Sequence, residues 1–300
     1  MVQFVPFFTE SSVIVLNTKE KIPYVVSSKS HTAVAVNCAA KAGEWIKSKL
    51  GQFKSLHIKS SMHDLVTEVD KGAEQMIRKL ILTHFPDHAI LGEEGVEPGS
   101  DASRQAWEQV KDEEYVWVID PLDGTTNYVH SFPFYSVSIA LAHHGEVIVG
   151  VVYDPTRDEL FVAEKGKGAY VHGRRMQVAP EKELSGSLIA SGFPAERTRA
   201  LPANLAGIQA LAPQVRNIRT AGSAALHMAY VAAGRLTGFW ELNLNAWDLA
   251  AGSLLIRESG GQITDTHGQP YHLGVRDVVA TNGAIHDAFI GALEAAGAQG

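Results

Sequence analysis

The chain has 300 residues, of which 45% are hydrophobic and 20% charged, with 27 Gly and 12 Pro. This length leaves room for one large α/β unit or two smaller ones, and the composition excludes collagen-like, low-complexity and wholly disordered chains. The 26 Lys and Arg against 33 Asp and Glu give a formal net charge of −7, which makes a dedicated nucleic-acid-binding protein an unfavourable interpretation. An anionic substrate would therefore need bound cations or well-placed backbone N–H groups.

Cysteine content and hydropathy predict a cytoplasmic protein without membrane contact. Cys38 is the single cysteine, so an intrachain disulfide and a cysteine-rich zinc site are both excluded. No apolar run is long enough to span a bilayer. Residues 1–16 are partly hydrophobic but lack the basic start of a signal peptide.

The first half of the chain shows helices followed by strands. Residues 1–30 have no clear periodicity and are assigned to an N-terminal extension of unknown role. Apolar spacing predicts a helix over 31–50, stopped by Gly51, and a second helix that follows Asp70 and ends at Pro86. A polar loop is expected between the first two of the predicted strands, which lie at residues 88–91, 115–119, 135–142, 146–153, 160–163 and 169–171.

The second half alternates in the same way without repeating the sequence. Strands are predicted at residues 187–190 and 239–242, and helices at residues 203–212, 222–233 and 249–259. There is no internal repeat and no flexible linker. The fold class is therefore α/β, with two packed subdomains at approximately residues 31–185 and 186–300 of one domain.

The most informative segment is Asp-Pro-Leu-Asp-Gly-Thr-Thr at residues 120–126, directly after a buried strand. Pro121 fixes a turn on which Asp120 and Asp123 can converge, together with the carbonyl of Leu122. Such a set of oxygen ligands is typical of Mg²⁺ or Mn²⁺. The N–H groups of residues 124–126 could hold a phosphate. The competing interpretation is an Asx turn with helix N-caps.

Three further acidic sites fit the same chemistry, and each also has a structural interpretation. Asp70 precedes a helix and could be its N-cap. Glu93 and Glu94 follow a strand, where paired glutamates are usually solvated. Asp248 opens a helix, whose N-terminus favours a carboxylate whether or not it binds a metal.

Taken together, these segments resemble the signature blocks of the inositol monophosphatase family. The matching blocks are residues 64–70, 92–94, 117–130 and 247–252, in the family's order, and the resemblance runs from His31 to Ala288. It implies a layered αβαβα sandwich that hydrolyses phosphate monoesters with two or three Mg²⁺ ions, or with Mn²⁺.

The resemblance implies specific metal ligands. Glu93, Asp120 and the carbonyl of Leu122 match the ligands of the first metal. Asp120, Asp123 and Asp248 match those of the second, and a third, weaker metal would also use Glu93.

The resemblance also implies catalytic and substrate-binding residues. Asp70 and Thr125 match the pair that orients and deprotonates the attacking water. Glu93 is expected to be a third catalytic residue. Glu241, seven residues before Asp248, matches a position that faces the inositol ring. The expected substrate-binding residues are Leu122, Asp123, Gly124, Thr125, Arg219, Gly222, Ser223, Ala224, Glu241 and Asp248; Arg219 could equally form a surface salt bridge.

The function implied is hydrolysis of myo-inositol 1-phosphate by a lithium-sensitive, homodimeric enzyme. Hydrolysis of histidinol phosphate, fructose 1,6-bisphosphate or a nucleotide 3′-phosphate is an alternative on the same scaffold. A regulatory protein that contacts RNA or the transcription machinery is a second alternative, although the net charge makes nucleic acid an unfavourable partner. His143 and His144 fall in a predicted turn without a partner at ligand spacing, and are interpreted as surface histidines.

Overall fold

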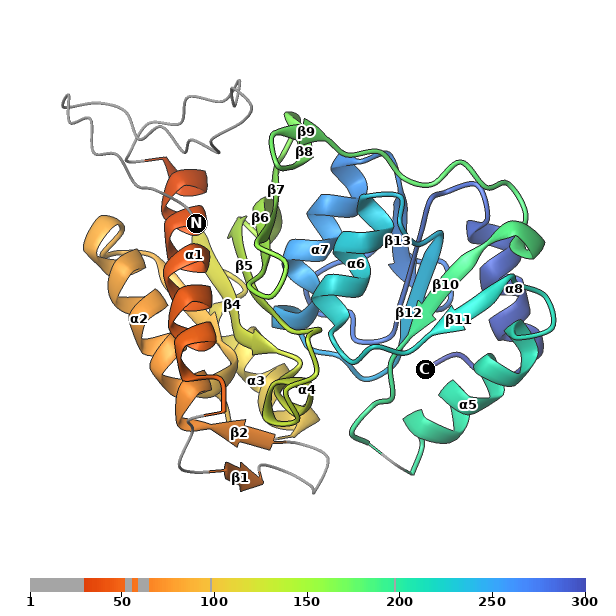
Figure 1. The fold of residues 1–300 in the computed structure, drawn as a ribbon, viewed down its shortest axis with the longest axis horizontal. Helices are drawn as coiled ribbons and strands as arrows, with labels where there is room; N and C mark the ends of the chain where they lie inside the picture. The colour runs from red at the N-terminus through yellow and green to blue at the C-terminus, as the bar shows by residue number, and fades with distance from the viewer. Residues whose placement is uncertain (1–29, 52–55, 59–64, 98, 197) are drawn as a thin grey trace.

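Helices and sheets alternate in five layers across the protein (Figure 1). The computed structural model describes residues 30–51, 56–58, 65–97, 99–196 and 198–300. The predicted extension at residues 1–30 and the start of the 64–70 block lie almost wholly outside the described residues. Among the residues that are described, no helix is both long and apolar enough to cross a lipid bilayer.

The first two layers are a helix pair and a seven-stranded sheet. Helices α1 (His31–Lys49) and α2 (Glu68–His84) cover one face of the sheet, and their apolar sides share a buried cluster with it that includes Cys38. Strands β3 and β4 are parallel and the remaining neighbours antiparallel. The strand order is β3 (Ala89–Gly92), β4 (Tyr115–Asp123), β5 (Ser136–His143), β6 (Glu146–Asp154), β7 (Glu159–Glu164), β8 (Gly168–Val171) and β9 (Arg174–Arg175).

The central helix layer connects this sheet to a second one. Helices α6 (Ala224–Ala232) and α7 (Ala246–Glu258) pack between the two sheets, and the largest apolar cluster fills both of their faces. Helices α5 (Ala200–Leu211) and α8 (His286–Ala295) form the outer layer (Figure 1). The second sheet has the order β11 (Asn217–Arg219), β10 (Leu188–Ser191), β12 (Gly238–Glu241), β14 (Val278–Thr281) and β13 (Gln262–Asp265). The predicted αβαβα sandwich is confirmed.

Several local predictions are corrected by the structure. Helix α2 starts at Glu68, after a short β1–β2 pair (Leu56–Ile58 and Leu65–Thr67), so Asp70 lies within the first turn and is not the N-cap. The segment predicted as a polar loop contains helix α3 (Ser100–Val110), whose partly buried Trp107 packs against the main core. That helix is only weakly apolar in sequence, so its packing partner could not be inferred locally.

Candidate metal centre

Three carboxylates meet where the first sheet contacts the central helices. Asp120 and Asp123 lie on β4 and Asp248 in the first turn of α7, and each offers an oxygen within 4.8 Å of the others. Residues three apart on a regular strand face opposite sides. Here the register of β4 against β5 shifts between Asp120 and Asp123, and this irregularity lets both carboxylates turn to one point.

Asp123 is fixed by the N-terminus of α6. Its carboxylate accepts hydrogen bonds from the Ser223 hydroxyl, from Ala225 N–H at 2.8 Å and from Ala224 N–H at 3.3 Å. Burial raises the pKa of Asp123 to about 6, although these three donors act to lower it. Ser223 and Ala224, predicted as substrate contacts, instead donate these hydrogen bonds to the Asp123 carboxylate.

Asp248 is fixed by its own helix start. Its Oδ2 accepts the Asn245 N–H at 2.7 Å. Burial, followed by the charges of Asp123 and Glu93, raises the pKa of Asp248 to about 8. The preceding carbonyl, on Trp247, accepts the Ser138 hydroxyl from β5 at 3.1 Å, which ties this helix start to the first sheet.

Glu93 approaches from a third direction, at the end of β3. It opens the short 3₁₀ turn η1 (Glu93–Gly95), and its charge and hydrogen bonding help to raise the pKa of Asp120, although burial is the largest cause. This turn is held by Glu74 of α2, which accepts the Glu94 N–H at 2.8 Å and binds Arg78 at 2.7 Å. Glu74 was not predicted; the only signal in the sequence is its i,i+4 spacing to Arg78.

The donor set fits a hard divalent cation. Asp120 is 2% exposed and its pKa lies well above the ordinary range because of burial and the neighbouring acidic groups. Glu241, 8% exposed at the end of β12, has its pKa raised by burial and by the charges of Asp248 and Asp123. Closely spaced buried carboxylates favour protonation unless positive charge is added, and Mg²⁺ or Mn²⁺ prefers such oxygen ligands.

A hydroxyl–carboxylate pair lies beside the three aspartates. The Thr125 hydroxyl is 2.9 Å from Asp70 Oδ1 and 3.1 Å from the Leu122 carbonyl oxygen. Thr125 opens the short helix α4 (Thr125–Val129) directly after Gly124, whose φ is +96°. A Cβ on Gly124 would lie 3.1 Å from the carbonyl oxygens of Gly222 and Phe134, so both conformation and space require glycine.

The loop before α6 is anchored by two side chains that the sequence did not reveal. Asn127 donates to the carbonyls of Ala221 and Phe134, each at 2.6 Å. His227 Nε2 accepts the Ala221 N–H at 3.2 Å, and burial lowers the pKa of His227 to about 3, which keeps the ring neutral. Asn127 ends the Asp-Pro-Leu-Asp block, which was its only signal. Both backbone groups of Ala221 are therefore fixed.

The remaining predicted substrate positions differ in exposure. Glu241 is buried against Gly192, where a Cβ would lie 2.0 Å from its carboxylate. Gly222 is exposed and has a φ of +82°. Arg219 is exposed at the end of β11, and its guanidinium donates to the Ile218 carbonyl at 3.0 Å.

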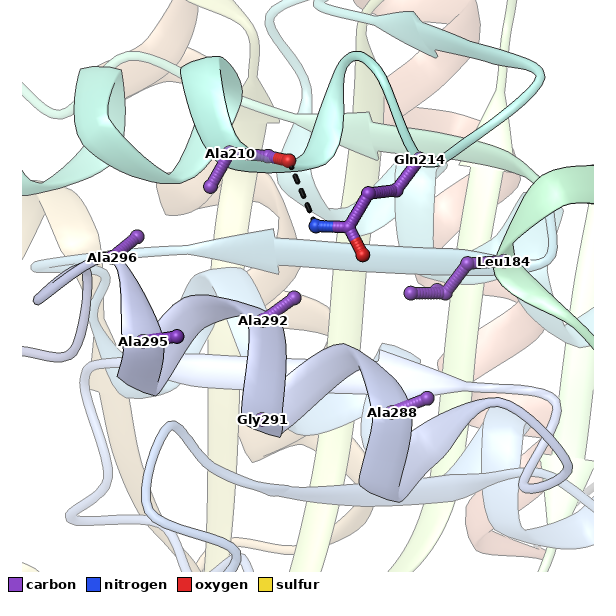
Figure 2. Close-up of a pocket in the computed structure, with 8 residues that line it drawn as sticks. All are labelled: Leu184, Ala210, Gln214, Ala288, Gly291, Ala292, Ala295 and Ala296. Carbon is purple, nitrogen blue, oxygen red and sulfur yellow. Dashed lines mark hydrogen bonds between the residues drawn. The ribbon is translucent and has the colours of Figure 1, made fainter.

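A separate groove of about 520 Å³ lies between α5 and α8 (Figure 2). On its α5 side, Gln214 donates to the Ala210 carbonyl at 2.9 Å. Its other lining residues are Leu184, Ala288, Gly291, Ala292, Ala295 and Ala296, none of which carries a charge or a metal-binding side chain. The groove contains none of the predicted site residues.

Comparisons with known proteins agree with this architecture. The model of the inositol monophosphatase family matches residues 28–298. Inositol monophosphatase 2 of Solanum lycopersicum is 42% identical over 263 residues, which are 87% of this chain and 96% of that protein. Nus factor SuhB of Pasteurella multocida is 41% identical over 249 residues, which are 82% of this chain and 89% of that protein.

A solved structure shows the same likeness in three dimensions. The inositol monophosphatase from Anabaena (Nostoc) sp. PCC 7120 superposes with a TM-score of 0.76 at 38% identity, over 88% of this chain and 95% of that one. Family model, sequence relatives and fold therefore agree over most of the chain. The protein belongs to the inositol monophosphatase family.

Proposed function

We propose that the protein hydrolyses a phosphate monoester with Mg²⁺, and that its preferred substrate is myo-inositol 1-phosphate. The observation on which this rests is the convergence of Asp120, Asp123 and Asp248 within 4.8 Å, beside the Thr125–Asp70 hydrogen bond. Glu93 and the Leu122 carbonyl complete the proposed set of metal ligands.

The residues around this centre suggest how a water would be activated. Mg²⁺ held by these carboxylates would supply positive charge that lowers the pKa of a water and stabilises the leaving alkoxide. The Thr125 hydroxyl, bonded to Asp70 Oδ1, has lone pairs free to accept a hydrogen bond from that water. Asp70 is 1% exposed and would take the proton through Thr125. The N–H groups of Gly124 and Thr125 would bind the phosphate oxygens.

The preference for inositol rests on Glu241 and on the relatives. The Glu241 carboxylate lies near Asp248 and Asp123, at the end of β12, where it could accept a hydrogen bond from a substrate hydroxyl. Relatives named inositol monophosphatase support the same choice. Gly222 and Arg219 would line the more exposed side of the substrate.

A substrate panel tests this proposal. Phosphate release is measured with and without Mg²⁺ on myo-inositol 1-phosphate, fructose 1,6-bisphosphate, histidinol phosphate and a nucleotide 3′-phosphate. Mg²⁺-dependent release, fastest from the inositol ester, is expected. Asp120→Asn should lose roughly 100-fold in turnover at the same Mg²⁺ concentration, because one of the proposed metal ligands is removed. Preference for a bisphosphate would reject the inositol assignment, and wild-type turnover by Asp120→Asn would reject the ligand assignment.

A second candidate function is that of a Nus factor, the name that the Pasteurella relative bears. It would need a partner surface outside the carboxylate centre. The test is whether Asp120→Asn, which should be inactive, still co-purifies with the transcription machinery.

Our proposals of a homodimer and a cytoplasmic location rest on the family resemblance and on sequence composition. Sedimentation analysis would check the homodimer, and cell fractionation would check the location.

A further inference from the structure

A cluster of one glutamate and two histidines lies at the far end of the strand that carries Asp120 and Asp123. Glu114 precedes β4, and His143 and His144 end β5 and open its turn. Each offers one ligand atom within 4.8 Å of the others. Both histidines lie at the surface as predicted, but antiparallel pairing brings Glu114, 29 residues before His143, next to them, a partner that the sequence analysis did not identify.

The backbone of the hairpin fixes these three residues together. Tyr115 pairs with His143 across β4 and β5, and His144 N–H donates to the Glu114 carbonyl at 2.9 Å. The turn residues His144 and Gly145 have φ values of +48° and +77°. This left-handed pair is the geometry of a two-residue hairpin turn, in which Asn or Asp is usual at the first position.

The turn conformation brings the two imidazoles to one place. The ring centroids of His143 and His144 are 4.3 Å apart. His143 Nε2 lies 3.6 Å from Glu114 Oε1. Tyr115 stacks on His143 with ring centroids 4.6 Å apart, and it also stacks on His88 with ring centroids 4.5 Å apart. This column of rings restricts the orientation of His143, so less ordering is required when an ion binds.

We propose that Glu114, His143 and His144 form a second metal site, which binds a divalent transition-metal ion such as Zn²⁺. Two imidazoles and one carboxylate are ligands typical of Zn²⁺, Ni²⁺ or Cu²⁺, whereas Mg²⁺ prefers oxygen ligands alone. Water would complete the coordination, because Glu114 and His144 are exposed. An ion bound here would connect the residue before β4 to the β5 turn.

This site is distinct from the carboxylate centre. Asp120 lies five positions after Tyr115 on β4, and at the usual rise per residue the two are about 17 Å apart. No side chain of one site can ligate an ion in the other. The proposal therefore stands or fails independently of the phosphatase assignment.

The chain provides a matched control for the test. His172 also occupies a turn before a glycine, with φ values of +50° and +72° for His172 and Gly173. It too faces a glutamate, with Nε2 3.7 Å from Glu159 Oε1. No third ligand joins this pair within the part of the chain that the structure describes. Asn tolerates the left-handed conformation, so His144→Asn and His172→Asn preserve both turns.

Zn²⁺ is titrated by calorimetry into the full-length protein in saturating Mg²⁺, so that Mg²⁺ competes with Zn²⁺ for the carboxylate centre. We expect one binding event that His144→Asn weakens at least tenfold and that His172→Asn leaves unchanged. Asp120→Asn should retain it, and Mg²⁺-dependent turnover of His144→Asn should equal that of the wild type. Absence of the event in the wild type, or equal affinity in His144→Asn, would overturn the proposal. Anomalous scattering at the zinc edge would locate the ion.

Discussion

Replacing Asp248 by Asn should reveal the electrostatic cost of assembling the carboxylate centre without a metal. The pKa of Asp248 is raised to about 8 by burial and by the charges of Asp123 and Glu93. Asn keeps an oxygen that can accept the Asn245 N–H, so the helix start survives the substitution. The variant therefore keeps the helix start but removes one titrating group and its charge, which also acts on Asp120 and Glu241.

The sign and size of the effect follow from linkage. Because its pKa is higher in the folded protein, Asp248 holds a proton that the unfolded chain has lost, so its contribution to the free energy of unfolding falls as pH rises toward 8. Between pH 6.5 and pH 8.5 that loss is about 2 kcal/mol at roughly 1.4 kcal/mol per pKa unit. Over this pH interval, the free energy of unfolding of the variant should rise by about 2 kcal/mol relative to that of the wild type, because the variant lacks the Asp248 carboxyl group.

Urea unfolding of both proteins in EDTA, at the two pH values, measures this change. Buried histidines such as His227, whose pKa is lowered to about 3 by burial, affect both proteins equally and cancel in the difference. In saturating Mg²⁺ at pH 8.5 the wild type should be more stable than the variant, because only the wild type has the complete set of proposed metal ligands. A stability difference that stays constant with pH in EDTA would refute the raised pKa and the electrostatic argument built on it.

Three further outcomes are expected. Asn127→Ala and the isosteric Asn127→Asp should each lower the free energy of unfolding by about 2 kcal/mol, measured by urea unfolding, because the Ala221 and Phe134 carbonyls lose their donor; an unchanged midpoint would contradict this anchoring role. Gly192→Ala should displace the Glu241 carboxylate and raise KM for myo-inositol 1-phosphate roughly tenfold, with little change for p-nitrophenyl phosphate; an equal effect on both esters would argue against a contact with the ring. Li⁺ should inhibit Mg²⁺-dependent phosphate release, and insensitivity at high Li⁺ would separate this chain from the behaviour expected of its family.

Local sequence patterns were sufficient for the elements that depend on near neighbours. The apolar spacing of 31–50 predicted α1, and Pro86 correctly marked the end of α2. Alternating β-rich runs around Gly145 predicted the β5–β6 hairpin. These features follow from periodicity and turn chemistry, which the chain specifies over a few residues.

The identity of the acidic residues was also readable, but their convergence was not. Asp120 and Asp123 were expected to meet on a turn, whereas the structure brings them together through a register shift in a continuing strand. Asp248 joins them because α7 packs against the first sheet, a contact between segments more than a hundred residues apart.

Tertiary structure alone decided which ordinary polar residues support the centre. Glu74 and Asn127 lie on helices where their sequence context is unremarkable in periodicity, yet each holds a backbone group of a distant loop, and His227 holds the Ala221 N–H six residues before it. The same is true of Glu114 beside His143, which only the pairing of β4 with β5 reveals. Side-chain types and local spacing determine which chemical groups a segment carries. The packing of whole layers determines which of these groups lie close together in space.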